Sequence, residues 1–138
     1  MEHLLGQILH VGISVYDMEQ SLAWYRDVLG FRLIKDDGFL PPLGARICFM
    51  EKDGFQLELF EYQQPKPLPA ERLRPNDDLQ TVGTKHAAFQ VPDMDAMLRH
   101  LADHGIEPVQ NIRMGADRVV FIHDCNGILI ELIETPSA

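Results

Sequence analysis

The segment His10-Val11-Gly12-Ile13-Ser14-Val15 has a counterpart in His86-Ala87-Ala88-Phe89-Gln90-Val91, and these two segments decide the fold that the sequence predicts. Each opens on a histidine and then alternates between two faces, as a β-strand does. Each runs into an Asp-Met pair, Asp17-Met18 or Asp93-Met94, where we expect the aspartate to cap the start of a helix. The chain thus contains the same strand-and-helix start twice.

The ends of the two repeats match as well. Leu57-Glu58-Leu59-Phe60-Glu61 aligns with Ile130-Glu131-Leu132-Ile133-Glu134, and both run apolar-Glu-Leu-apolar-Glu. Alternation and turn signals between these landmarks predict further strands, so that each repeat is a β-α-β-β-β unit. We expect strands at about residues 7–15, 31–35, 47–50 and 55–60 in the first unit, and 85–91, 107–110, 118–123 and 128–133 in the second.

A proline-rich segment, residues 62–84, joins the two units. It shows little periodicity, and we expect an irregular connection of the kind that serves as a linker or a lid. A loop is also expected at residues 36–44, which hold turn residues and two prolines. The prediction is one α+β domain over residues 1–138, with tandem βαβββ modules at about 7–61 and 85–134.

The composition is that of a globular protein, with 46% hydrophobic and 24% charged residues in a chain of 138. A formal net charge of −9 argues against nucleic acid and against an anionic membrane as partners. Cys48 and Cys125 fit no metal-binding spacing and are expected to be reduced thiols. Residues 1–10 do not resemble a signal peptide, and no run is long enough to span a bilayer. These features predict a soluble cytoplasmic protein.

Two glutamates, Glu58 and Glu131, lie in the middle of apolar strands. A carboxylate in such surroundings is costly to bury unless it is paired, protonated or bound to a cation. A single strand histidine or glutamate is most often an ordinary structural residue, but His10, Glu58, His86 and Glu131 recur at equivalent positions of a repeat. If each helix covers the other face of its sheet, the two half-sheets curve around a metal cavity in which these four side chains meet. That donor set suits one divalent ion such as Zn, Ni, Co, Fe or Mn.

Other polar residues give weaker signals. His100 and His104 are spaced i, i+4 near the end of the second helix, but no third ligand is evident, and we expect them on the surface. His123 precedes a turn and is a candidate for the mouth of the cavity. The last glutamate of each final strand, Glu61 or Glu134, alternates to the face opposite the candidate ligands and is expected to be solvated.

These features resemble the vicinal oxygen chelate superfamily, which includes glyoxalases, bleomycin resistance proteins and dioxygenases. The resemblance covers nearly the whole chain outside the proline-rich segment. It is carried by His10-Val11-Gly12-Ile13, Trp24-Tyr25-Arg26-Asp27-Val28-Leu29-Gly30-Phe31, Lys85-His86-Ala87-Ala88-Phe89 and Gly127-Ile128-Leu129-Ile130-Glu131-Leu132. Members that resemble glyoxalase I bind their metal through His-Glu-His-Glu, which corresponds here to His10, Glu58, His86 and Glu131. Extradiol dioxygenases and fosfomycin-modifying enzymes have no ligand that matches Glu58.

The resemblance therefore implies a divalent-metal-dependent lyase or isomerase of the glyoxalase type. Such enzymes remove a proton next to a carbonyl, stabilise the enediolate with the metal, and use a metal-binding glutamate as the base. Glu131 is the first candidate for this role and Glu58 the second. The alternatives are an acyl-CoA epimerase similar to methylmalonyl-CoA epimerase, a non-catalytic small-molecule-binding protein of the resistance type, and a ring-cleaving dioxygenase.

Two positions depart from the pattern of bacterial glyoxalase I. Ser14 stands where those enzymes place an arginine for glutathione, and Tyr62 stands where they place an asparagine. The resemblance therefore does not extend to a glutathione pocket. Family members close the cavity within one chain or across a dimer, and a duplicated unit leaves sheet edges exposed, so we expect a homodimer.

Overall fold

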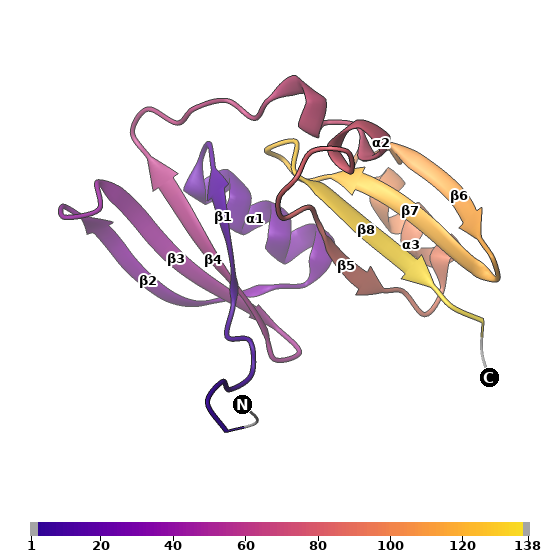
Figure 1. Cartoon of the computed structure of the whole chain (residues 1–138), viewed down its shortest axis with the longest axis horizontal. Helices are drawn as coiled ribbons and strands as arrows, with labels where there is room; N and C mark the ends of the chain where they lie inside the picture. The colour runs from indigo at the N-terminus through magenta and orange to yellow at the C-terminus, as the bar shows by residue number, and fades with distance from the viewer. Residues whose placement is uncertain (1–2, 137–138) are drawn as a thin grey trace. The chain divides into compact units, whose positions relative to one another are not determined.

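The computed structural model describes residues 3–136, and the chain divides into two compact units with the division after Pro65. The first unit has the element order β1 (Val11–Val15), α1 (Met18–Leu29), β2 (Arg32–Leu40), β3 (Ala45–Lys52) and β4 (Phe55–Tyr62). Its strands form one sheet in the order β1-β4-β3-β2 (Figure 1). Strand β1 is parallel to β4, and the remaining pairs are antiparallel.

The second unit repeats this arrangement after a short helical stretch made of η1 (Ala70–Arg72) and α2 (Pro75–Asp78). Its elements are β5 (Ala87–Gln90), α3 (Met94–Asp103), β6 (Gln110–Met114), β7 (Asp117–His123) and β8 (Leu129–Glu134). The sheet order is β5-β8-β7-β6, with β5 parallel to β8 and the other pairs antiparallel. The predicted α+β class and the tandem βαβββ modules are confirmed.

Each main helix starts at the aspartate that the sequence indicated. Asp17 Oδ1 accepts a hydrogen bond from the Gln20 amide at 2.9 Å, and Asp93 Oδ1 accepts one from the Ala96 amide at 3.0 Å. Gly30 follows α1 with a φ of 77°, a left-handed conformation that ends a helix at little cost for glycine. The repeated Asp-Met pair therefore positions both helices in the same way.

The prediction that Glu61 and Glu134 are solvated is wrong. Glu61 Oε2 accepts a hydrogen bond from the Met18 amide at 2.5 Å, and Glu134 Oε2 accepts one from the Met94 amide at 2.6 Å. These amides belong to the first turn of α1 and α3, where backbone donors have no partner within the helix and the helix dipole favours a negative charge. The last strand of each sheet therefore holds the start of its helix through a carboxylate.

Several strand boundaries differ from the predicted ones, because hydrogen bonding to the neighbouring strand sets where a strand begins and ends. Strand β1 begins at Val11, because its pairing with β4 begins at the Val11–Leu57 pair. Strand β2 continues to Leu40 through residues expected to form a loop, and its irregular residues make bulges there, with Gly38 at a φ of 67°. Strand β6 lies at Gln110–Met114, later than the predicted 107–110.

The proline-rich segment is more ordered than the sequence indicated. The Asp78 carboxylate, 2% exposed, lies 3.2 Å from Arg72 Nε and 3.2 Å from Lys85 Nζ. His123 Nε2 donates a hydrogen bond to the Leu73 carbonyl at 2.6 Å. Residues 72–78 are thus fastened within the second unit by ion pairs to the buried Asp78 and by a side-chain hydrogen bond from His123. Apart from η1 and α2, residues 63–84 form no helix or strand.

Apolar residues of each helix pack against one face of the sheet in its own unit. In the first unit Met18, Tyr25 and Val28 of α1 are buried, and in the second Met94 and Leu101 of α3 are fully buried. Cys48 is also fully buried and Cys125 partly so, and neither forms a disulfide. Burial raises the pKa of the Cys48 thiol to about 11. Across residues 3–136, no helix combines the length and the apolar character needed to cross a membrane.

Glu134→Ala removes the carboxylate that holds the first turn of α3. We expect the free energy of unfolding to fall by about 1 to 2 kcal/mol, because the Met94 amide loses a charge-assisted hydrogen bond. Urea denaturation followed by circular dichroism measures the change. Glu107→Ala, at an exposed position, is the control and should shift stability by less than about 0.5 kcal/mol. Equal effects of the two substitutions would contradict the capping role.

Candidate functional site

In the first unit the structure brings His10 and Glu58 together. His10 lies directly before β1, and the parallel register of β1 and β4 places Gly12 beside Glu58. His10 Nε2 is 3.3 Å from Glu58 Oε1. The His10 ring also meets the ring of Phe49 edge to face, with centroids 5.3 Å apart. Phe49 faces Glu58 directly across the β3–β4 pair, so the three side chains form one group.

The second unit contains the same group. His86 Nε2 is 3.8 Å from Glu131 Oε2, and the parallel register of β5 and β8 places Ala88 beside Glu131. The His86 ring meets the ring of Phe121 edge to face, with centroids 4.9 Å apart. Phe121 faces Glu131 directly across the β7–β8 pair. Each unit therefore contains a His-Glu-Phe group built on corresponding strands.

These four charged or titratable side chains are partly shielded from water. The side chains of His10 and Glu58 are 34% and 19% exposed, and those of His86 and Glu131 are 14% and 20% exposed. Each His-Glu pair remains partly exposed to solvent, and an aromatic ring packs against its histidine. Partial exposure of this kind allows a ligand to approach and limits the desolvation cost of the carboxylate.

The spacing within the first pair fits two ligands of one metal ion, and the spacing within the second pair is wider. Bonds of about 2.0 to 2.2 Å to a divalent ion place neighbouring donor atoms about 3 to 3.5 Å apart. The measured separations are 3.3 Å in the first unit and 3.8 Å in the second. The separation of 3.8 Å is too long for a direct hydrogen bond between His86 Nε2 and Glu131 Oε2. The imidazole and the carboxylate therefore lie side by side without bonding to each other through these atoms.

Within the described residues of either unit, no group of three or more His, Cys, Asp or Glu side chains forms a possible metal site. The structure thus brings His10 to Glu58 and His86 to Glu131, and the four-residue set stays a prediction. A unit alone supplies two protein ligands, whereas stable zinc sites use three or four.

Sequence reasoning missed Phe49 and Phe121. Each lies opposite the candidate glutamate and packs its face or edge on the candidate histidine. An apolar residue in an apolar strand gives no distinct signal by itself. The sequence offered one clue to these phenylalanines, which is their equivalent position in the repeat. Both lie on the strand that directly precedes the glutamate strand, β3 before β4 and β7 before β8. In the first unit, Lys35 of β2 lies beside Phe49 in the sheet, and its Nζ is 5.8 Å from the centre of the Phe49 ring.

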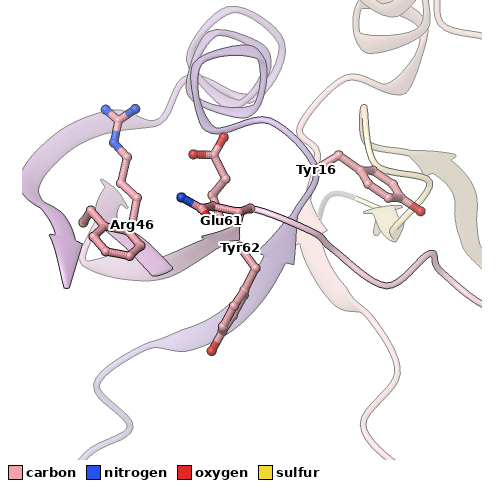
Figure 2. A pocket seen from close by; sticks show the side chains of 6 residues that line it. Tyr16, Arg46, Glu61 and Tyr62 are labelled. Carbon is pink, nitrogen blue, oxygen red and sulfur yellow. The ribbon is translucent and has the colours of Figure 1, made fainter. Parts of the chain in front are cut away.

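A separate hollow of about 400 Å³ lies in the first unit, lined by Tyr16, Phe39, Arg46, Glu61, Tyr62 and Gln63. Figure 2 shows Glu61 and Tyr62 pointing in opposite directions from the end of β4. Arg46 binds Glu19 and Asp36 at 2.7 Å each, which lowers the pKa of Asp36 to about 2. The charged groups of this hollow are therefore committed to structural pairs, and the hollow is not the candidate site.

The family model described as the Glyoxalase/Bleomycin resistance protein/Dioxygenase superfamily matches residues 7–132. The chain belongs to this superfamily. The match spans both His-Glu-Phe groups, since His10 and Glu131 lie just inside its limits. Membership is therefore established for the portion of the chain that contains the candidate site.

Several relatives of known sequence match over nearly the whole chain. YaeR of Escherichia coli, an uncharacterized protein, is 32% identical, with 94% of this chain and 97% of YaeR covered. Human mitochondrial methylmalonyl-CoA epimerase is 29% identical, with 93% of this chain and 73% of the epimerase covered. A probable lactoylglutathione lyase of Synechocystis is 28% identical, with 94% and 96% covered. The superfamily members similar to this chain thus include proteins named as enzymes.

Solved structures show the same fold. A glyoxalase family protein from Enterococcus faecalis superposes with a TM-score of 0.78 at 23% identity, with 97% of this chain and 100% of that chain covered. A variant of the fosfomycin resistance protein FosX from Listeria monocytogenes, determined with Mn(II), gives a TM-score of 0.68 at 16% identity, with 94% and 92% covered. At these identities the likeness concerns the fold.

Phe121→Leu tests whether the ring of Phe121 orients His86. We expect the ring-proton resonances of His86 to move in the NMR spectrum, because an edge-to-face aromatic contact at 4.9 Å contributes a ring-current shift. Phe89→Leu, on the opposite face of β5, is the matched control and should leave those resonances in place. Unchanged His86 signals in Phe121→Leu would contradict the contact.

Proposed function

We propose that the protein is a divalent-metal-dependent lyase or isomerase of the glyoxalase type, with His10, Glu58, His86 and Glu131 as the ligands of one ion. The observation that carries the proposal is the repeated His-Glu pair, which has the same aromatic neighbour in both units. Two imidazoles and two carboxylates suit Zn, Ni, Co, Fe or Mn. The set takes two ligands from each unit, within one chain or between two chains.

A bound ion would supply Lewis-acid polarisation of a substrate carbonyl, which makes the neighbouring carbon more acidic. Within this chain, Glu131 is the proposed general base, and Glu58 is the second candidate. Either carboxylate can accept the proton from the carbon beside the carbonyl and return it to the same or the adjacent carbon. Phe49 and Phe121 lie across the strand pairs from the two glutamates, and their rings contact the two histidines edge to face.

A second candidate is an acyl-CoA epimerase, favoured by the 29% identity to human methylmalonyl-CoA epimerase over 93% of this chain. Both reactions begin by removing a proton beside a carbonyl, and they differ in the carbon that receives it. A small-molecule binder would perform no proton transfer, and a ring-cleaving dioxygenase would require iron and consume oxygen. Ser14 and Tyr62 stand at the positions where glyoxalase I enzymes contact glutathione, so the proposal does not name glutathione as the thiol.

We also propose that the working form is a homodimer. Within the described residues, the edge strands are β1 and β2 in the sheet of the first unit and β5 and β6 in that of the second. Unpaired strand edges invite association, and identical chains most often associate as twofold dimers.

His86→Ala should abolish tight metal binding. Purified protein loaded with Zn(II) or Mn(II) and passed through gel filtration is expected to retain one ion for each site, and the variant is expected to retain at least tenfold less. Elemental analysis of the eluted protein gives the ratio. His3→Ala, at an exposed position, is the control and should retain the same amount as the unmodified protein. Stoichiometric retention in His86→Ala would overturn the ligand assignment.

Glu131→Gln should remove proton-transfer activity. We expect solvent deuterium to enter the α-carbon of a productive 2-oxoaldehyde–thiol adduct or acyl-CoA at least about 100-fold more slowly, because an amide cannot act as the base. Mass spectrometry of the recovered substrate measures the exchange, and Glu58→Gln identifies which carboxylate is the base. Exchange that continues unchanged in both variants would exclude these roles. A protein that exchanges no substrate of the panel would instead fit the binder.

A further inference from the structure

The end of α3 holds a second pair of imidazoles, His100 and His104, with ring centroids 4.6 Å apart. We propose that these residues form an exchangeable binding site for one divalent transition-metal ion, separate from the site proposed above. The sequence alone indicated two surface residues with no third ligand. The structure adds the geometry of the two rings and a hydrogen bond from one of them to the backbone.

The hydrogen bond fixes the donor state of His104. Its Nδ1 lies 2.9 Å from the carbonyl oxygen of His100, and since a carbonyl can only accept, Nδ1 carries the proton. A neutral imidazole protonated at Nδ1 has its lone pair on Nε2, the form in which it binds a metal. Metal-binding histidines commonly donate their other ring N–H to a backbone carbonyl or a carboxylate.

This hydrogen bond arises from the way the helix ends. The His104 amide bonds to the Leu101 carbonyl, and the His104 side chain bonds to the His100 carbonyl in the last turn. The ring of His104 is thereby turned back along the helix toward His100. The ring that could bind a metal is thus oriented before any ion is present.

The distance between the rings fits one ion. Two nitrogens bound to a common ion at about 2.0 to 2.1 Å lie about 3 Å apart when they occupy neighbouring positions. Rings with centroids 4.6 Å apart and an interplanar angle of 58° can place one nitrogen each at that separation with small side-chain rotations. Residues four apart on a helix are neighbours on its surface, which is the arrangement used by paired histidines in zinc enzymes.

The surroundings favour a cation. The C-terminal end of a helix carries partial negative charge, the last residue of α3 is Asp103, and the whole chain has a net charge of −9. Two imidazoles favour Ni(II), Cu(II) or Zn(II) over Mg(II) or Ca(II). With two protein ligands and water in the remaining positions, the ion should exchange quickly, whereas an ion held by four protein ligands should not.

The site is independent of the pair formed by His86 and Glu131. Glu134 of β8 points to the start of α3, and Glu131 alternates to the opposite face of the sheet. The two sites therefore lie on different faces of the second unit, and a substitution in one leaves the ligands of the other in place.

Calorimetric titration with Ni(II) after gel filtration tests the proposal. We expect the unmodified protein to bind one exchangeable ion per chain, and His100→Ala and His104→Ala to weaken this binding at least tenfold while retaining the tightly bound ion. His3→Ala is the matched control and should bind as the unmodified protein does. Broadening of the His100 and His104 ring signals by Ni(II) in the NMR spectrum gives a second readout.

The outcomes separate this proposal from the proposed function. Exchangeable binding within twofold of normal in both His100→Ala and His104→Ala, or no Ni(II) effect on their ring signals, would overturn it. His86→Ala should keep the exchangeable ion and lose the tight one. If His86→Ala leaves the tight ion in place, the proposed function fails and the site on α3 stands. Circular dichroism of His104→Ala checks that the helix itself is retained.

Discussion

The structure of each unit depends on a carboxylate that holds the start of the helix from the last strand of the sheet. Glu61 and Glu134 accept hydrogen bonds from the first-turn amides of α1 and α3. Because side chains alternate along a strand, the glutamate three residues earlier, Glu58 or Glu131, must face the other way. One short pattern, apolar-Glu-Leu-apolar-Glu, therefore fastens a helix on one face and places a carboxylate on the other.

The His-Glu-Phe groups of the two units are similar but not identical. Gly12 lies beside Glu58, and a Cβ at this position would be 3.2 Å from the Phe60 ring. The equivalent position beside Glu131 holds Ala88, where the residue corresponding to Phe60 is the smaller Ile133. In the first unit, the absence of a side chain at Gly12 leaves room for the larger side chain of Phe60. The histidine and the glutamate can therefore lie in a similar arrangement in both units.

The sequence was sufficient to predict those features whose signal is local or occurs in both repeats. The helix starts followed from Asp17 and Asp93, and the pairing of His86 with Glu131 followed from equivalent positions in the repeat. The partner of Glu61 could not be predicted, because the Met18 amide is 43 residues away in sequence and only the fold brings it near. Phe49 gave no signal, because an apolar residue in an apolar strand is expected whether or not it packs on a histidine.

The two His-Glu-Phe groups differ at the positions next to them in the sheets. Both groups contain a histidine, a glutamate and a phenylalanine. The residue paired with the phenylalanine on the next strand differs, since it is Lys35 beside Phe49 and Gln110 beside Phe121. In the second unit this face is also apolar, with Val119, Phe121 and Leu129 packed together. The shared residues provide the same donor atoms in both units, whereas charge and shape differ around them. Under the proposed function, discrimination between substrates would come from these residues, which are not duplicated.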